Sequence, residues 1–274
     1  MPQVFNTISD LRAALKPLRK DGVAMVPTMG ALHAGHVALV TQARKHAPHV
    51  VVSIFVNPTQ FAPNEDFDAY PRTLEADLAR LPDDAIVFAP TAREMYRDGY
   101  ASTITVGGPS AGLETDFRPR FFAGVATVVA KLLIAAAPDA AMFGEKDYQQ
   151  LLVVKQLVRD LALPVRIIGV PTLREADGLA MSSRNAYLAP DERRIAARLN
   201  VILHEAIANA RHGDPRLAET GAVTALEQAG FDSVDYVAIR DAETLAQITT
   251  LERPARSLAA ARIDKTRLID NMAV

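Results

Sequence analysis

The chain has 274 residues, a net charge of −2 and no cysteine, and its apolar and charged fractions of 49% and 23% are those of an ordinary globular protein. The length suggests about two domains, and the near-neutral charge gives no electrostatic footprint for nucleic acid or an anionic membrane. The absence of cysteine excludes a disulfide framework, a thiolate metal site and a cysteine nucleophile.

Two further features predict a cytoplasmic protein without a membrane partner. Residues 1–20 are amphipathic and charged throughout, unlike a secretory signal. Residues 125–138 form the longest apolar run, but Lys131 interrupts it and it is shorter than the roughly 20 residues that a membrane span needs.

Short apolar runs alternate with segments of helical periodicity in the first part of the chain. The runs are typical of strands buried on both faces, and they lie at residues 23–27, 50–56, 85–89, 140–143 and 165–170. Helices are predicted between them, at residues 35–46, 73–81, 125–137 and 148–161. This alternation predicts an α/β fold with a parallel sheet covered by helices on both faces. Ligands of such sheets bind at the carboxyl ends of the strands.

The pattern changes near residue 175. A helix start is indicated by Pro190-Asp191-Glu192. From there we expect a long helix, a second helix, a strand, a third helix and an apolar segment, at residues 190–211, 217–229, 234–239, 243–251 and 257–263. The order predicts a small α+β domain at residues 176–274, after a first domain at residues 1–175.

Two glycines and two histidines follow the first predicted strand, in Pro27-Thr28-Met29-Gly30-Ala31-Leu32-His33-Ala34-Gly35-His36. Glycines allow close backbone approach to a ligand, and a helix N-terminus favours phosphate. His33 and His36 are three residues apart, so both imidazoles point the same way in a first helical turn and suit a polyphosphate. Taken alone, the pair also fits half of a zinc site or a polar helix start. The segment is neither a Walker A motif nor a dinucleotide fingerprint.

Asn57 and Gln60 follow the second predicted strand. Neutral amide donors can hold a substrate carboxylate without an ion pair, which would leave its oxygen more nucleophilic. The alternative interpretation of Asn57-Pro58 is ordinary turn chemistry.

Two later segments have the same character. In Gly144-Glu145-Lys146-Asp147-Tyr148-Gln149-Gln150, Lys146 could reach a phosphate and Asp147 could bind a ribose hydroxyl or cap the helix, with Gln150 one turn further on. In residues 178–185, Ser182, Ser183 and Arg184 could form a flexible phosphate clamp. Each segment alone also fits a capped surface helix or a surface loop.

Together these segments resemble the pantothenate synthetase (pantoate–β-alanine ligase) family over most of the chain. The matching segments are residues 27–36, 55–61, 64–67, 70–72, 143–150, 177–185 and 266–271. The His-x-Gly-His turn and the Ser-Ser-Arg loop are shared in kind with nucleotidylyltransferases and class I tRNA synthetases. The segments Asn57-Pro58-Thr59-Gln60-Phe61 and 144–150 occur in a much narrower range of proteins. The combination of all these segments is specific to the family.

The resemblance implies an ATP-dependent ligase that joins pantoate to β-alanine through a pantoyl adenylate. It implies a Rossmann-like nucleotidylyltransferase domain followed by a small C-terminal lid domain, Mg²⁺ carried by ATP rather than by the protein, and a cytoplasmic homodimer. His36 matches the position usually marked as catalytic, with His33 and Lys146 facing phosphate. Gln60 and Gln150 hold pantoate, and we place Asn57 with them.

The implied ATP contacts are divided among several segments. Gly144 and Asp147 meet the ribose, the backbone at Leu173 meets adenine, and Ser182, Ser183 and Arg184 clamp the triphosphate. The full implied set is Met29, Gly30, Ala31, Leu32, His33, Ala34, Gly35, His36, Gly144, Glu145, Lys146, Asp147, Leu173, Met181, Ser182, Ser183 and Arg184.

Three positions depart from the family pattern. Arg120 and Phe121 stand where the family usually has glycine and histidine, in Arg118-Pro119-Arg120-Phe121-Phe122-Ala123-Gly124-Val125. A positive φ at Arg120 would strain the backbone, and the lost histidine removes a polar group from the substrate pocket. Asp264 also replaces a common glycine before the terminal motif.

Three other functions compete with the ligase. A nucleotidylyltransferase acting on a phosphorylated acceptor would need cations where the chain offers Gln60 and Gln150. A catalytically silent nucleotide-binding protein is suggested by the change at Arg120-Phe121. A zinc hydrolase based on the two histidines has no evident third ligand.

Overall fold

The computed structural model describes residues 1–62, 65 and 67–274. Pro63, Asn64 and Asp66 lie outside this set, and with them two residues of the expected motif at 64–67. The chain divides into two compact units, each described by itself. Unit 1 comprises Met1–Glu145 and Val153–Pro171, and unit 2 comprises Lys146–Leu152 and Thr172–Val274. The domain boundary expected at residue 175 stays a prediction.

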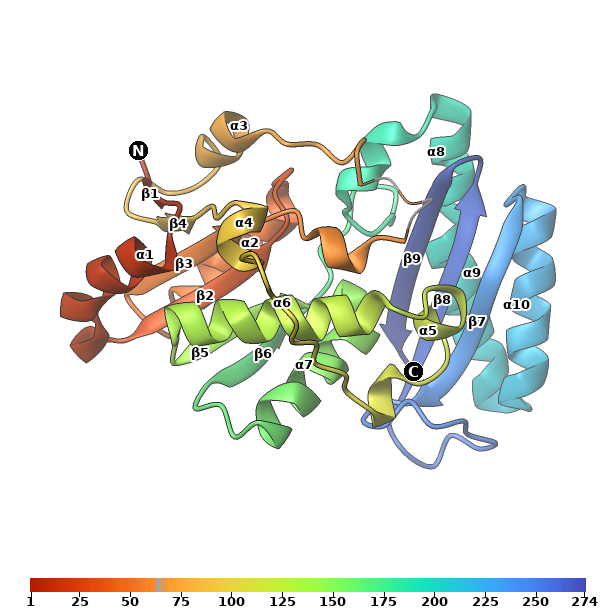
Figure 1. The fold of residues 1–274 in the computed structure, drawn as a ribbon. Coiled ribbons are helices and arrows are strands. Elements are labelled where there is room, and N and C mark those ends of the chain that lie inside the picture. The colour runs from red at the N-terminus through yellow and green to blue at the C-terminus, as the bar shows by residue number, and fades with distance from the viewer. Residues whose placement is uncertain (63–64, 66) are drawn as a thin grey trace. The chain divides into compact units, whose positions relative to one another are not determined.

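Unit 1 contains a six-stranded parallel sheet with the order β1-β4-β3-β2-β5-β6 (Figure 1). Its strands are β1 (Gln3–Phe5), β2 (Val23–Thr28), β3 (His49–Ile54), β4 (Ile86–Phe88), β5 (Ala140–Gly144) and β6 (Arg166–Val170). The five strands predicted from sequence correspond to β2–β6, and β1, which pairs only with β4, was not predicted. The order places β2 between β3 and β5. The carboxyl ends of β2 and β5 therefore form the topological switch point at which such sheets bind ligands.

Helices cover both faces of this sheet. Ala24 and Val26 of β2 pack in one core with Leu39 and Val40, while Met25 between them is equally buried on the other face. The longer helices are α1 (Ile8–Leu15), α2 (Ala34–Ala43), α6 (Phe121–Ala136) and α7 (Tyr148–Asp160). Shorter helices are α3 (Leu74–Leu78), α4 (Ala92–Met95) and α5 (Glu114–Phe117). The apolar strands flanked by helices confirm the predicted α/β class.

Unit 2 contains a three-stranded antiparallel sheet, β7-β8-β9, packed against α9 and α10 (Figure 1). Its elements are α8 (Pro190–Ala196), α9 (Arg198–His212), α10 (Pro215–Ala229), β7 (Ser233–Asp241), β8 (Ala255–Ile263) and β9 (Thr266–Ala273). Leu199, Leu203, Leu226 and Leu268 lie in the core between sheet and helices. The small α+β unit was predicted, although β9 was not.

Two helix predictions in unit 2 were wrong in detail. The long helix expected over residues 190–211 is broken at Ala197, which ends α8 and precedes α9. The helix expected over residues 243–251 is absent; a turn opens that stretch, and Gln247 forms an isolated bridge with Arg240. The Asp241 side chain accepts hydrogen bonds from the backbone N–H groups of Glu243 and Thr244 at 3.0 and 2.8 Å. Such local bonding competes with helix formation.

Within the described part of the chain, none of the helices combines the length and apolarity that crossing a bilayer requires.

Candidate active site

In unit 1, the turn that links β2 to α2 is held in an unusual backbone conformation. Gly30 has φ +90°, and a Cβ there would lie 3.0 Å from a carboxylate oxygen of Asp77. Ala31 has φ +50°, a conformation that costs a non-glycine residue energy. The Thr28 hydroxyl donates to the Ser53 carbonyl at 2.6 Å and accepts from Gly30 N–H at 3.3 Å. The hydrogen bond from Thr28 to Ser53 holds this turn to strand β3 directly before α2 begins.

The two histidines cap α2 reciprocally. His33 is the N-cap, and its Nδ1 accepts from the Gly35 N–H at 3.1 Å. The His36 Nδ1 accepts from the His33 N–H at 3.2 Å. Since a neutral imidazole has one N–H, both caps place the proton on Nε2 and make that atom the donor. The ring centroids lie 4.1 Å apart, and both residues belong to the first turn at the positive end of the helix.

Asp77 holds this turn and was not predicted as a site residue. It lies on α3 and is 2% exposed. Its carboxylate accepts from the N–H groups of Ala31 and Leu32 at 3.0 and 2.7 Å. These bonds explain how Ala31 is kept at positive φ. A carboxylate four residues before the buried Leu81, on the apolar side of a predicted helix, was the available sequence signal.

Gln60 is oriented by Asn57 and lies against the turn after β2. The Asn57 Nδ2 donates to the Gln60 Oε1 at 3.1 Å, and the Gln60 Nε2 donates to the Met29 Sδ at 2.8 Å. Because the oxygen of the Gln60 amide faces Asn57, its nitrogen is the group presented toward Met29. The structure thus brings together three of the residues selected from sequence.

The Asn57 amide is itself fully engaged. It is 1% exposed, its nitrogen also donates to the Gly124 carbonyl at 3.3 Å, and its oxygen accepts from the Tyr96 hydroxyl at 2.6 Å and the Thr59 hydroxyl at 3.0 Å. Burial raises the pKa of Tyr96, against a lowering by its hydrogen bond with Thr59. Tyr96 therefore stays a neutral donor. These contacts give Asn57 the geometry of a support for Gln60, and Tyr96 is a further supporting residue that sequence did not suggest.

The segment that departs from the family pattern is unstrained. Arg120 has φ −101° and precedes α6, so the strain considered from sequence does not arise. The Phe121 ring lies under the Arg118 guanidinium, 3.7 Å from its carbon to the ring centroid. Arg118 pairs with Glu65 at 2.6 Å and donates to the Gln60 carbonyl at 3.3 Å. Phenylalanine thus packs within a cation–π contact that supports the Gln60 loop.

Two hydrogen bonds within unit 2 anchor the residues that follow β5. A 3₁₀ turn, Glu145–Asp147, leads into α7. The Lys146 carbonyl accepts from the Asn271 Nδ2 at 2.7 Å, and the Tyr148 hydroxyl donates to the Ala242 carbonyl at 2.8 Å. Lys146, Asp147 and Gln150 remain half-buried. In unit 1, a Cβ at Gly144 would meet no atom within 4 Å, so protein packing does not require glycine there.

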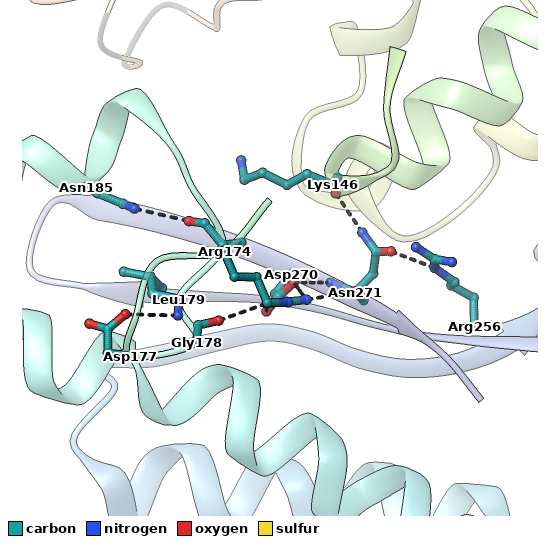
Figure 2. Close-up of polar contacts among 10 residues, drawn as sticks. Lys146, Arg174, Asp177, Gly178, Leu179, Asn185, Arg256, Asp270 and Asn271 are labelled. Atoms are coloured by element: carbon teal, nitrogen blue, oxygen red, sulfur yellow. Dashed lines mark hydrogen bonds and ion pairs between the residues drawn. The ribbon is translucent and has the colours of Figure 1, made fainter. Parts of the chain in front are cut away.

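The second predicted phosphate segment of unit 2 follows a tight loop. Arg174 and Ala180 pair across it, and the Met181 N–H donates to the Leu173 carbonyl at 3.0 Å. Arg174 forms a bidentate pair with Asp270, at 2.7 and 2.9 Å (Figure 2). Beyond the loop, Ser182 caps a 3₁₀ turn by accepting from the Arg184 N–H at 3.3 Å. The side chains of Ser182, Ser183 and Arg184 are half-buried rather than freely exposed.

Arg193 braces the same loop from α8. It pairs with Asp177 at 2.8 Å and with Glu175 at 3.0 Å. The hydrogen bond from Arg193 lowers the pKa of Asp177, and hydrogen bonds from Arg193 and then Asn185 lower that of Glu175. The loop therefore rests on charged groups whose ionised forms the fold favours.

The described residues contain no group of three or more histidine, aspartate or glutamate side chains able to hold a metal ion. The two histidines of the turn therefore belong to no such group within the described part of the chain. The two hydrogen bonds given above are those of a helix cap.

Comparison with known proteins agrees with the geometry. The family model described as pantoate-beta-alanine ligase matches residues 3–273. Pantothenate synthetases of Mesorhizobium japonicum and Bradyrhizobium sp. are 59% and 55% identical to the chain, covering all of it and 98% and 99% of their own lengths.

Solved structures give the same result. A pantothenate synthetase from Thermus thermophilus is 47% identical, with a TM-score of 0.92 and 98% of each chain covered. A pantoate-beta-alanine ligase from Francisella tularensis, complexed with beta-gamma ATP and beta-alanine, is 34% identical with a TM-score of 0.84, covering 99% of this chain and 97% of its own. This chain therefore belongs to the pantoate–β-alanine ligase family.

Proposed function

We propose that the chain condenses pantoate with β-alanine in two steps, with the residues described above in defined roles. First, a pantoate carboxylate oxygen attacks the α-phosphorus of ATP, and the bond from that phosphorus to the bridging oxygen breaks to release pyrophosphate. Second, the β-alanine amine attacks the carbonyl carbon of the pantoyl adenylate, AMP leaves with the carbon–oxygen bond electrons, and the amine loses a proton. Family membership over residues 3–273 supports the reaction.

The start of α2 is the observation that carries the residue-level proposal. Reciprocal capping leaves Nε2 as the donor on both His33 and His36, beside the positive end of a helix. Phosphoryl transfer needs positioning and electrostatic stabilisation more than covalent chemistry from the protein. We assign His36, with His33, to the charge that grows on the α-phosphate and on the departing pyrophosphate, and the turn at Met29–His36 to ATP binding.

Gln60 is assigned to the pantoate carboxylate. Its Nε2 now contacts the Met29 sulfur, which is a weak acceptor. A carboxylate oxygen is a far stronger acceptor, so exchanging one for the other favours binding. An uncharged amide also leaves the carboxylate electron-rich for attack. We assign Gln150 to the same substrate, and Asn57 to holding Gln60 rather than to contacting pantoate.

The residues of unit 2 are assigned to the nucleotide, as the resemblance implies. Lys146 and the Ser182–Arg184 segment meet phosphate, Asp147 with Gly144 of unit 1 meets the ribose, and the backbone at Leu173 meets adenine. The anchored backbones at Lys146 and Leu173 support these roles, because groups held in place lose little freedom on binding.

Mg²⁺ enters as a companion of ATP. The ion prefers phosphate oxygens and water to a cage of protein ligands, and the described side chains hold no acidic or histidine cluster that would act as such a cage. When bound, it neutralises phosphate charge.

Pyrophosphate–ATP exchange tests the proposal directly. The wild-type chain is expected to exchange label from pyrophosphate into ATP only when pantoate is present, and to make pantothenate when β-alanine is added. Chelation with EDTA should stop the exchange and added Mg²⁺ should restore it. Exchange without pantoate would instead indicate a nucleotidylyltransferase, and no exchange at all would indicate a silent nucleotide-binding protein.

We also assign the chain to the cytoplasm as a homodimer. The support is the family resemblance and the lack of cysteine, which suits a reducing compartment. Sedimentation equilibrium of the purified chain and fractionation of the producing cells test the two points. A fully active monomer would contradict the homodimer.

A further inference from the structure

The strand β9 carries two adjacent polar residues in positions where burial makes partners obligatory. Asp270 is 2% exposed and Asn271 is 3% exposed. Asp270 shares a face of the strand with Leu268 and Met272, which belong to the core of unit 2, and Asn271 points to the other face. A buried carboxylate or amide costs free energy unless it is hydrogen-bonded. Their partners include residues of two segments of unit 2 that are distant in sequence.

Asn271 fixes the segment at Lys146. Its Nδ2 donates to the Lys146 carbonyl at 2.7 Å, while its Oδ1 accepts from the Arg256 Nε at 2.6 Å (Figure 2). Arginine can only donate, so Arg256 determines which end of the amide faces Lys146. The Arg256 guanidinium also lies 4.2 Å from the centre of the Tyr148 ring. The start of α7 is thereby fastened at its backbone and at an aromatic ring.

Asp270 fixes the segment that leads to Met181. In the bidentate Arg174–Asp270 pair, the Nη1 of Arg174 that donates to the carboxylate also donates to the Gly178 carbonyl at 3.0 Å (Figure 2). The carboxylate also accepts from the Asn271 N–H at 2.7 Å. The Asp270 carboxylate therefore holds Arg174 to β9, and through Arg174 it holds Gly178 on the other side of the loop. It also fixes the backbone of Asn271. Bidentate arginine–carboxylate pairs are among the most orienting contacts in proteins.

We infer that Asp270 and Asn271 are positioning residues that hold two nucleotide-binding segments of unit 2 to one strand. The inference rests on the proposed function, in which Lys146, Leu173 and Ser182–Arg184 contact ATP. It gives a role to the terminal motif at residues 266–271. A misplacement of about 1 Å in such groups is enough to reduce a rate about 10²-fold. The pair acts through those segments and does not itself contact substrate.

Asn271→Asp tests the first tie without changing side-chain size. Aspartate still accepts from Arg256, but it sets a carboxylate oxygen against the Lys146 carbonyl. We expect the KM values for ATP and for pantoate both to rise by about 10-fold or more, because Lys146 and Gln150 lie on the displaced segment. Unchanged KM values in folded protein would overturn the inference.

Arg174→Lys tests the second tie. Lysine keeps the charge beside Asp270 but loses the bidentate bond and the contact with Gly178. We expect the KM for ATP to rise by about 10-fold and the KM for pantoate to stay within about 2-fold of wild type. This split separates positioning from a general loss of stability, which would not single out one substrate.

Asp235→Asn is the matched control. Asp235 is a half-buried carboxylate of the same sheet, and it pairs with Arg267 at 2.7 Å and Arg262 at 3.8 Å, both in that sheet and outside the two segments. Wild-type KM values are expected for this variant, and KM changes equal to those of the test variants would overturn the inference. ATP binding to each protein by isothermal titration calorimetry completes the experiment. A wild-type chain that fails to bind ATP would refute the proposed function itself, whereas wild-type-like binding by both test variants would refute only the positioning role.

Discussion

His36 has two separable tasks, because one ring nitrogen caps α2 while the other is assigned to phosphate. Glutamine at the third helical position can accept from the N-cap N–H, as it does in a capping box. His36→Gln therefore keeps the cap and loses the imidazole, whereas His36→Ala loses both.

The structure sets the size of each effect. The lost cap bond from His33 N–H to His36 Nδ1, 3.2 Å long, is worth about 0.5–1.5 kcal/mol. For a domain of this size about 1 kcal/mol lowers the melting temperature by roughly 2–4 °C. Removing one donor to transition-state charge typically lowers kcat by about 10²–10³-fold. Both variants should lose that much exchange activity, while only His36→Ala should melt at a lower temperature.

Pantoate-dependent pyrophosphate–ATP exchange and thermal unfolding followed by circular dichroism measure the two effects on the same samples. His33→Asn is a parallel case, because asparagine is a good N-cap and should likewise preserve stability while reducing exchange. If His36→Gln exchanged at the wild-type rate, the imidazole would have no part in catalysis. If His36→Ala had the same melting temperature as His36→Gln, the cap bond would contribute nothing to stability.

Three other outcomes are expected. Gly124→Ala should lower the free energy of unfolding by about 1–3 kcal/mol and raise the KM for pantoate, since the new Cβ would lie 2.7 Å from the Thr59 carbonyl carbon in the loop that carries Gln60. Urea unfolding and a pantoate titration measure the two effects. A wild-type KM for pantoate would contradict the close approach. Asp264→Gly should raise the free energy of unfolding by about 0.5–1 kcal/mol, because Asp264 has φ +48° and its backbone bond to Asp232 is retained, as denaturant titration will show. The pKa values of Glu175 and Asp177 are lower in the folded chain than in the unfolded chain, so at a pH between the folded and unfolded values the unfolded chain binds more protons. The stabilisation from these two carboxylates is therefore present above pH about 4.5 and is lost as the pH falls further. Arg193→Gln should make the melting temperature depend less on pH between about 3 and about 7, and an unchanged dependence would refute the assignment.

The parallel sheet could be predicted because its strands are buried on both faces and therefore read as continuous apolar runs. The same logic fails for β1, which has only three residues, and for β9, where Arg267, Asp270 and Asn271 interrupt the apolar pattern. The helix expected at residues 243–251 failed because the Asp241 side chain captures the backbone N–H groups that would begin it.

The residues selected for chemistry follow strands, and that position could be inferred from sequence. The residues that hold these side chains in place could not be inferred from sequence. Asp77, Tyr96 and Asn271 reach their partners across 46, 39 and 125 positions of sequence. Such contacts depend on the tertiary fold, and nothing in the local pattern around either partner announces them. The roles given to the selected residues stay predictions until the exchange assays are done.

The tie between Lys146 and Asn271 has a consequence for protein synthesis. The ribosome makes the two residues 125 positions apart, which at typical elongation rates is an interval on the order of 6–25 s. During that interval the start of α7 has been synthesised but its partner strand has not. A nascent chain stalled before residue 266 is therefore expected to show no pantoate-dependent exchange, so that translation order itself delays the onset of ATP consumption.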